Sequence, residues 1–190
     1  MNTFGSPAQL ATFLGFDADE ARCTLLLQLV SDAIRATLQQ DIDQVVDDVV
    51  ILTPEHDLRV AFLPQLPVTE VSLVEQGSNT TNDWRVLDPA NYHWSASGVL
   101  TRRGPGARWW SDWSDHCYDL RVTYTHGYEV VPDALVAVAI AVAARMYENP
   151  IGATAEAIGG YSVSYGKVGG ITFTDYENET LGRYDVARIA

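Results

Sequence analysis

Hydrophobic and polar positions along the chain change their spacing twice, from a helical period to short alternating runs and back. Ser6 and Pro7 stand where an N-cap residue and a proline of the first helical turn belong, and Gly15 follows as a stop signal. After acidic residues at 17–20, apolar positions three and four residues apart predict an amphipathic helix of roughly 20 residues. Its expected apolar stripe consists of Leu25, Leu26, Leu29, Val30, Ala33, Ile34 and Leu38.

The middle of the chain, from residue 45 to about residue 128, favours β-structure. Runs rich in β-branched and aromatic residues alternate with turn-forming residues, which is typical of short antiparallel strands. Gly98 ends the sequence SASG, which predicts a hairpin turn at 95–98. The predicted strands are 45–52, 58–63, 68–76, 84–87, 92–94, 99–102 and 120–128.

The last third of the chain returns to a helical pattern. A helix is predicted from Pro132 to Tyr147, and it is apolar nearly all round, so its neighbours could include other subunits. A glycine-rich segment at 159–170 and a short helix at 175–183 follow. We therefore expect an α+β fold: an N-terminal helix pair, an antiparallel β insertion, a long apolar helix, a glycine-flanked β arm and a short C-terminal helix.

This pattern also predicts a domain organisation. Residues 1–44 and 129–150 are expected to form a helical core, and residues 45–128 a β-rich insertion. Residues 151–190 are expected to form an extended arm and a C-terminal docking segment. The whole is expected to be one compact unit.

Composition and charge narrow the possible functions. The chain has 190 residues, of which 47% are hydrophobic, so it can bury a core without disulfides or metals. It carries 25 acidic and 12 basic residues, for a net charge of -13, which leaves too few cations to grip a nucleic-acid duplex. An acidic surface would instead let nucleic acid slide past. The longest apolar stretch, 134–144, is too short to cross a bilayer, and we expect a soluble protein made in a cytosol, with no membrane partner.

The segments that resemble ligand-binding motifs lack the residues or the spacing that those motifs require. The sequence GYSVSYGKV at 160–168 lacks the spacing and the hydroxyl residue of a phosphate-binding loop, and DIDQVVDD at 41–48 lacks the later ligands of a calcium loop. The four histidines do not have metal-site spacing, and Cys23 and Cys117 are expected to be unlinked thiols. We expect no catalytic residue, no cofactor, no metal and no enzymatic activity.

A tryptophan cluster is the most unusual local feature of the sequence. Trp109, Trp110 and Trp113 follow a Gly-Pro-Gly turn, and three cations flank them: Arg102, Arg103 and Arg108. Tryptophan is enriched at protein interfaces and can stack on sugars. The cluster could close the end of the β unit, form a protein interface or serve as a carbohydrate platform. These six residues are the candidates for a partner interface.

Several short sequence segments, in their order along the chain, resemble segments of the head-to-tail connector proteins of tailed phages (the adaptor or head-completion family). Together they span nearly the whole chain. They are LATFLG at 10–15, LPVTEV at 66–71, YHWSASGVL at 92–100, RVTYTHG at 121–127 with VPD at 131–133, and EAIGGYSVSY at 156–165.

The resemblance implies a structural virion protein, made in the host cytoplasm and located in the neck, at the head–tail interface. It would form a cyclic ring of about twelve copies between the portal protein and the next connector or tail ring. Such a ring extends the DNA channel and helps retain packaged DNA, without sequence-specific binding. The alternative is a β-rich module that binds carbohydrate through Trp109, Trp110 and Trp113.

Two sets of contact residues are expected by analogy with that family. An arm between subunits would use Tyr161, Val163, Tyr165 and Lys167. Portal docking would use the apolar residues of the C-terminal segment, which are Tyr176, Leu181, Tyr184 and Ile189.

Overall fold

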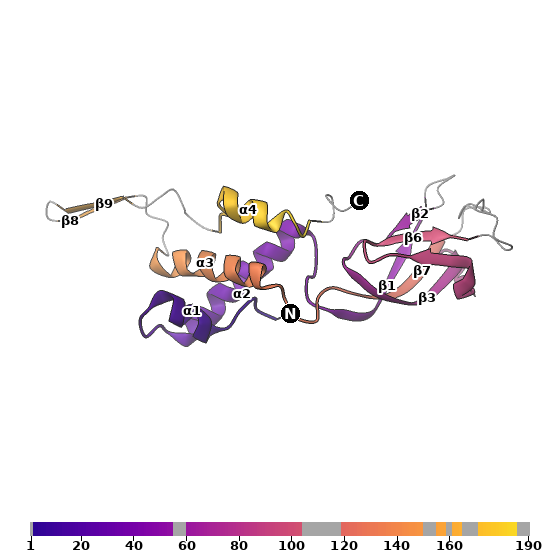
Figure 1. Cartoon of the computed structure of the whole chain (residues 1–190), viewed down its shortest axis with the longest axis horizontal. Coiled ribbons are helices and arrows are strands. Elements are labelled where there is room, and N and C mark those ends of the chain that lie inside the picture. Colours follow the sequence, from indigo (N-terminus) through magenta and orange to yellow (C-terminus); the bar gives the residue numbers. More distant parts are fainter. Residues whose placement is uncertain are drawn as a thin grey trace. The chain divides into compact units, whose positions relative to one another are not determined.

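The computed structural model describes residues 2–54, 60–103, 119–149, 155–158, 161–164 and 171–185. Helices and antiparallel strands coexist in it, so the predicted α+β class is confirmed (Figure 1). The sequence predicts one compact unit, but the contacts separate into two. The helical unit comprises the described residues of Met1–Gln40 and Val131–Arg188, and the β unit those of Asp41–Val130. Each unit is described by itself.

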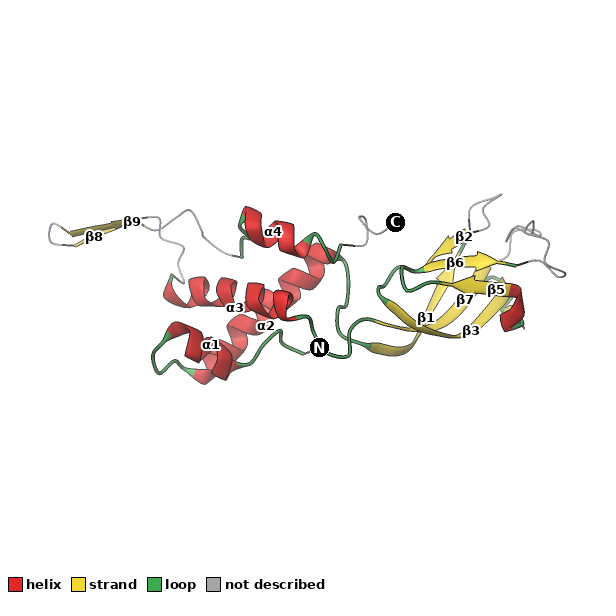
Figure 2. Ribbon diagram, in the orientation of Figure 1, coloured by secondary structure: helices red, strands yellow, loops and turns green. Residues whose placement is uncertain are grey.

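The helical unit joins segments from both ends of the chain (Figure 2). Helix α2 (Glu20–Leu38) contacts α1 (Pro7–Leu14) and α3 (Asp133–Glu148), and α3 in turn contacts α4 (Asp175–Leu181). A two-stranded hairpin of β8 (Ala155–Ile158) and β9 (Tyr161–Ser164) lies in the chain between α3 and α4. The core residues of this unit are Phe4, Leu10, Cys23, Leu26, Leu27, Val30, Ile34, Leu38, Leu135, Val138, Ala139, Val142, Ala143 and Leu181.

Local capping fixes where these helices begin and end. The Ser6 hydroxyl accepts from the Gln9 N–H, the Gln9 side chain accepts from the Ser6 N–H, and Pro7 fills the first helical position. Gly15 ends α1 in the left-handed conformation, with φ +76°. The predicted start and stop of this helix are therefore confirmed. Asp19 caps α2 by accepting from the N–H of Arg22.

The apolar stripe expected on α2 is confirmed in part, because Leu26, Val30, Ile34 and Leu38 are buried as predicted. Leu25 and Leu29 are 58% and 43% exposed, whereas Cys23 and Leu27 are fully buried. The run of three leucines at 25–27 fits two helical stripes on opposite sides of the helix. Contacts with α1 and α3, which no local pattern encodes, select the stripe that contains Leu27.

Helix α3 is 16 residues long, and much of its apolar surface is covered within the chain. Leu135, Ala139 and Val142 are at most 1% exposed, whereas Ala137 and Glu148 face solvent. The sequence suggests neighbours in other subunits for this helix. For the buried residues, the neighbours are α1, α2 and α4 of the same chain.

The β unit consists of two antiparallel sheets. One contains β1 (Val45–Leu52), β7 (Asp119–His126), β3 (Val68–Ser78) and β4 (Asp83–Val86), in that order. The other contains β2 (Val60–Phe62), β6 (Val99–Arg102) and β5 (Tyr92–Trp94), with the short helix η1 (Pro89–Asn91) before β5. Strand β1 carries a bulge between Val45 and Asp48, where Asp47 has φ +55°. Strands β1 and β4 are the two edges of the larger sheet.

One face of the four-stranded sheet forms the core of the β unit. Leu120, Val122 and Tyr124 alternate along β7 and are fully buried, as are Val74 on β3 and Leu100 on β6. The predicted hairpin turn at 95–98 is confirmed, with Gly98 at φ +76° and the Ser95 N–H donating to the Val99 carbonyl. The residues that alternate with these along each strand lie on the other face of the larger sheet, outside this core.

Candidate assembly surfaces

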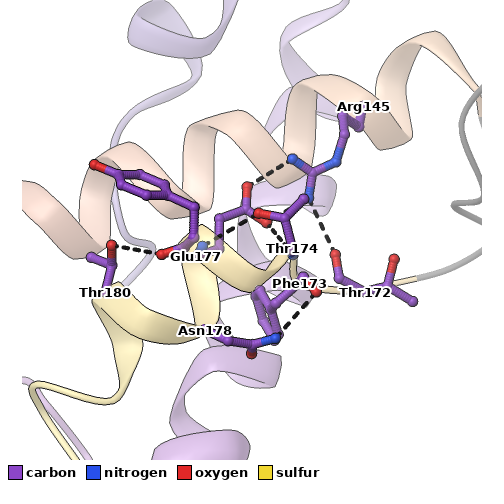
Figure 3. Close-up of polar contacts among 8 residues, drawn as sticks. Arg145, Thr172, Phe173, Thr174, Glu177, Asn178 and Thr180 are labelled. Atoms are coloured by element: carbon purple, nitrogen blue, oxygen red, sulfur yellow. Dashed lines mark hydrogen bonds and ion pairs between the residues drawn. The ribbon is translucent and has the colours of Figure 1, made fainter.

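An ion pair and a capping box hold α4 on the helical unit (Figure 3). The Arg145 guanidinium donates to both carboxylate oxygens of Glu177, at 2.7 and 2.9 Å, and also to the Thr172 carbonyl at 3.2 Å. The Thr174 N–H donates to Glu177, and the Glu177 N–H donates to the Thr174 hydroxyl. Burial acts to raise the pKa of Glu177, but hydrogen bonds from Arg145 and Thr174 outweigh it and lower this pKa.

The C-terminal docking candidates have different surroundings in this structure. Leu181 is 1% exposed and belongs to the core of the helical unit, so its side chain anchors α4. Tyr176 is 77% exposed, and Tyr184 is half-buried. Ile189 lies outside the described residues. Of the described candidates, Tyr176 therefore has the most exposed side chain.

The predicted arm contains the β8–β9 hairpin. Tyr161 pairs with Ile158, and Val163 pairs with Glu156, in antiparallel register. Tyr165 and Lys167 lie outside the described residues. The β pattern of alternating residues at 161–164 is therefore confirmed at the level of the backbone.

The residues of the tryptophan cluster itself, Trp109, Trp110 and Trp113, lie outside the described part of the chain, as does Arg108. The two remaining candidates bind within the β unit. Arg102 on β6 donates to the Gln76 side chain at 3.1 Å, which links the two sheets. The Arg103 backbone N–H donates to the Asn91 carbonyl at 2.7 Å.

The register of the larger sheet creates a surface that the sequence analysis does not identify. Ile51 on β1 lies opposite Arg121 on β7, which lies opposite Glu75 on β3, which lies opposite Val86 on β4. Residues paired in this way share one face of a sheet. The next row contains Val49, Thr123 and Leu73. We call this the outer sheet face, and its residues Val49, Ile51 and Val86 are 54%, 43% and 60% exposed.

An ion pair neutralises the centre of the outer sheet face. Arg121 donates to both Glu75 oxygens, at 2.6 and 2.8 Å, and its guanidinium lies 4.6 Å from the ring centre of Trp84. These hydrogen bonds are the main reason that the pKa of Glu75 is lowered and that of Arg121 is raised. Two carboxylates lie near the ends of these strands, each accepting a hydroxyl hydrogen bond: Asp47 from Ser72 and Asp119 from Thr53.

The helical unit has an exposed apolar surface of its own. Leu25 and Leu29 lie one turn apart on the solvent side of α2, and we call them the α2 ridge. Ala21 and Ala36, on the same side of the helix, are also exposed. Asp32 lies on this side too and forms an ion pair with Arg35 at 3.2 Å. The carboxylate of this face is therefore matched by a cation.

Within the described ranges, no cluster of three or more His, Cys, Asp and Glu side chains is placed to hold a metal ion. None of the helices in those ranges has the length and apolar character needed to cross a membrane. Cys23 is a free thiol, and burial is the main cause of its raised pKa. The features described above are exposed surfaces whose neighbouring strands and helices are linked by ion pairs.

Comparison with known proteins adds a likeness of fold. The chain matches no protein-family model and no curated protein sequence. Among solved structures, a chain of the "neck of empty GTA particle computed with C6 symmetry" matches with a TM-score of 0.56 and 14% identity, over 94% of this chain and 88% of that one. A chain of the "neck of native GTA particle computed with C12 symmetry" matches with a TM-score of 0.54 and 13% identity, over 94% and 86%. A chain of the "virion of native gene transfer agent (GTA) particle" matches with a TM-score of 0.55 and 14% identity, over 94% and 88%.

Proposed function

We propose that this protein is a structural component of the neck of a phage-like particle. The observation that carries the proposal is the fold likeness to chains of gene transfer agent necks, which covers 94% of this chain and so includes both units. The sequence segments that resemble connector proteins, which occur along nearly the whole chain, support the same role. The similar structures do not favour the carbohydrate-binding alternative.

In the finer form of the proposal, the protein is an adaptor in the virion neck. It forms a ring between the portal protein and the next connector or tail ring, extends the DNA channel and helps retain packaged DNA. The necks with similar chains were computed with six-fold and twelve-fold symmetry, which supports a ring of about twelve copies. The net charge of -13 supports a conduit that does not adhere to DNA. This role requires no catalysis.

The test uses the full chain and the portal protein of the same particle. We expect the chain to co-elute with portal rings on a sizing column and to add a ring of density at one end of the portal in electron micrographs. Tyr176→Ala is the matched variant, because it removes an exposed aromatic side chain without disturbing the core. The proposal is wrong if the folded chain ignores the portal at micromolar concentration and forms no ring.

A further inference from the structure

Strand β1 forms an open edge of the four-stranded sheet. Within the described ranges it pairs with β7 alone, so the backbone groups on its other side have no strand opposite them. Its bulge ends at Asp48, which leaves a regular stretch at 48–52. Three apolar side chains of this strand, Val46, Val49 and Ile51, are 65%, 54% and 43% exposed. A long and exposed apolar edge strand is a site at which a further strand can add.

Hydrogen bonds show which residues of β1 are directed at this open edge. The Val49 N–H donates to the Asp48 carboxylate at 2.9 Å rather than to β7. Directions alternate along a strand, so the backbone groups of Ile51 point the same way as those of Val49. The Thr123 carbonyl, opposite Val49 on β7, accepts from Ser72 on β3, as this alternation requires. An added strand would therefore bond to Val49 and Ile51, and the Val49 N–H would exchange a side-chain acceptor for a carbonyl.

The β8–β9 hairpin is a two-stranded sheet of its own. In the part of the chain that the structure describes, its strands pair only with each other. A two-stranded hairpin is marginally stable in water, and a third strand is one way to stabilise it. The chain thus contains both a hairpin without a third strand and a sheet edge without a neighbour.

Charge and strand propensity favour β9 over β8 as the strand that adds to β1. Strand β1 contains Asp47 and Asp48, and β8 contains Glu156. Like charges opposite each other destabilise a sheet, whereas β9 (YSVS) is uncharged. Tyrosine and valine also favour strands, while the alanines and the glutamate of β8 are depleted in them. The hairpin therefore has one edge suited to β1.

The turn of the hairpin determines which residues of β9 are directed outward. Ile158 and Tyr161 pair across a two-residue connection, and residues in this position are hydrogen-bonded to each other. The backbone groups of Tyr161 therefore point at β8. By alternation, those of Ser162 and Ser164 point to the open side of β9.

One antiparallel register joins these two open edges. Every pair of named strands in the described ranges is antiparallel, and this pairing is slightly more stable than a parallel one. Ser162 then lies opposite Ile51, and Ser164 opposite Val49. A shift of two residues in either direction would carry one serine into the bulge or beyond the end of β1.

This register also matches apolar faces. Tyr161 and Val163 alternate with the two serines, so they fall on the core side of the sheet, beside Val50 and Leu52. Val50 and Leu52 are only half-buried, since no strand covers their open side. Glu156, opposite Val163 on β8, would lie at the new edge, where a charge discourages further strands.

We propose that β9 of one copy adds to the β1 edge of the next copy in the ring and extends its four-stranded sheet. This inference rests on the proposed ring-forming function and names the contact between its subunits. A ring requires two different patches, one meeting the other on the next copy, and the hairpin and the β1 edge are such a pair. Main-chain hydrogen bonds supply the affinity, as in other cases of strand addition.

Cysteine cross-linking tests the contact, because it traps weak association. Ser162→Cys and Ile51→Cys chains, in a background with Cys117→Ser, are mixed in equal amounts with a short bismaleimide, alone and on portal rings. We expect the mixed Ser162–Ile51 dimer to exceed both homodimers several-fold. Val163→Cys is the matched control, because the register places position 163 on the opposite face of the sheet. With Ile51→Cys it should give several-fold less mixed dimer.

A proline variant provides a second readout. Ser162→Pro removes a backbone N–H that is directed at β1 but leaves the pairing of β9 with β8 intact. Ser162→Ala is its control, because it keeps this N–H. We expect Ser162→Pro to need at least a tenfold higher concentration to form rings, while Ser162→Ala assembles within twofold of the unsubstituted chain. Circular dichroism and urea unfolding verify that both variants fold.

Three outcomes overturn the contact between copies. The first is equal ring formation by Ser162→Pro and Ser162→Ala. The second is an internal cross-link in a chain that carries both Ser162→Cys and Ile51→Cys, without mixed dimers, which would mean that β9 adds to β1 of its own chain. The third is a dominant cross-link from Ile51→Cys to the portal with an amine–thiol reagent, which would assign the edge to a portal segment.

The same experiments separate this inference from the proposed function. Rings on the portal without the mixed Ser162–Ile51 dimer overturn the contact and leave the neck function intact. Absence of rings and of portal binding in the unsubstituted chain overturns both.

Discussion

The Arg145 guanidinium on α3 contacts both carboxylate oxygens of Glu177 on α4, across 32 positions of sequence. Glu177 is 6% exposed, so its charge is largely removed from water and depends on this partner. The pair therefore fixes the segment that carries Tyr176, the exposed docking candidate. Its strength can be measured in the isolated chain.

Arg145→Met should destabilise the chain by about 2 kcal/mol. The variant keeps the length of the side chain but leaves the buried Glu177 carboxylate without its cation, and the partial exposure of Arg145 reduces the cost below that of a fully buried pair. Urea unfolding at pH 7 measures the change. Arg183→Met, at an exposed position just after α4, should alter stability by less than about 0.5 kcal/mol. Equal effects of the two variants would contradict the structural role of the pair.

Acid should destabilise the protein through Glu75 and Glu177. The pKa of each lies below the ordinary value of 4.5 because each accepts hydrogen bonds from an arginine. A carboxyl with a lowered pKa in the folded state stabilises that state above the unfolded pKa, and this stabilisation is lost as the pH falls through the folded value. We therefore expect the unfolding free energy to fall as the pH decreases below 4.5.

A double variant, Glu75→Gln with Glu177→Gln, isolates this contribution. It should be less stable than the unsubstituted chain at pH 7, but its stability should change less between pH 4.5 and lower pH. Unfolding by urea at several pH values gives both slopes. Identical slopes would mean that other carboxyls control the acid response.

Local signals in the sequence are sufficient to predict where some helices and turns begin and end. Ser6, Pro7 and Gly15 define α1, and Gly98 defines the β5–β6 turn, because capping and left-handed backbone depend on residues within a few positions. The α+β class follows from the same patterns. The strand predicted at 45–52 also matches β1 as observed.

Features that depend on contacts between residues distant in the sequence cannot be predicted from the pattern of hydrophobic and polar positions. The leucines at 25–27 fit either side of a helix, and packing against α1 and α3 decides that Leu25 and Leu29 are exposed. The outer sheet face depends on strand order and register, which bring Ile51, Glu75 and Arg121 together from three strands. A one-residue shift in register would place these side chains on the opposite face.

Gly127→Ala should destabilise the β unit much more than Gly15→Ala. Both glycines have positive φ, +83° and +76°, so alanine costs each about 1 kcal/mol of backbone strain. At Gly127 an added Cβ would also meet the Asp43 carbonyl carbon at 2.8 Å and the Ile42 oxygen at 2.9 Å, whereas at Gly15 it would meet nothing within 4 Å. We expect a loss of at least about 3 kcal/mol at Gly127 by urea unfolding. Similar losses at both positions would show that the close approach is absorbed by a small backbone shift.

Leu181→Ala and Tyr176→Ala should separate the fold of α4 from its use in docking. Leu181 is 1% exposed, so truncation leaves a cavity and should cost about 3 kcal/mol. Tyr176 is 77% exposed, so its truncation should change stability by less than about 0.5 kcal/mol. Thermal and urea unfolding of the isolated chain measure both effects.

Binding of the same two variants to portal rings then tests their effect on docking. Tyr176→Ala should weaken co-elution with the portal, because an exposed aromatic side chain can contribute strongly to an interface without contributing to the fold. Leu181→Ala should weaken binding only to the extent that it unfolds α4, so low temperature or a stabilising osmolyte should restore it. Normal portal binding by Tyr176→Ala would remove this residue from the docking surface. Loss of binding by a fully folded Leu181→Ala chain would mean that α4 rearranges on the portal and presents its buried leucine.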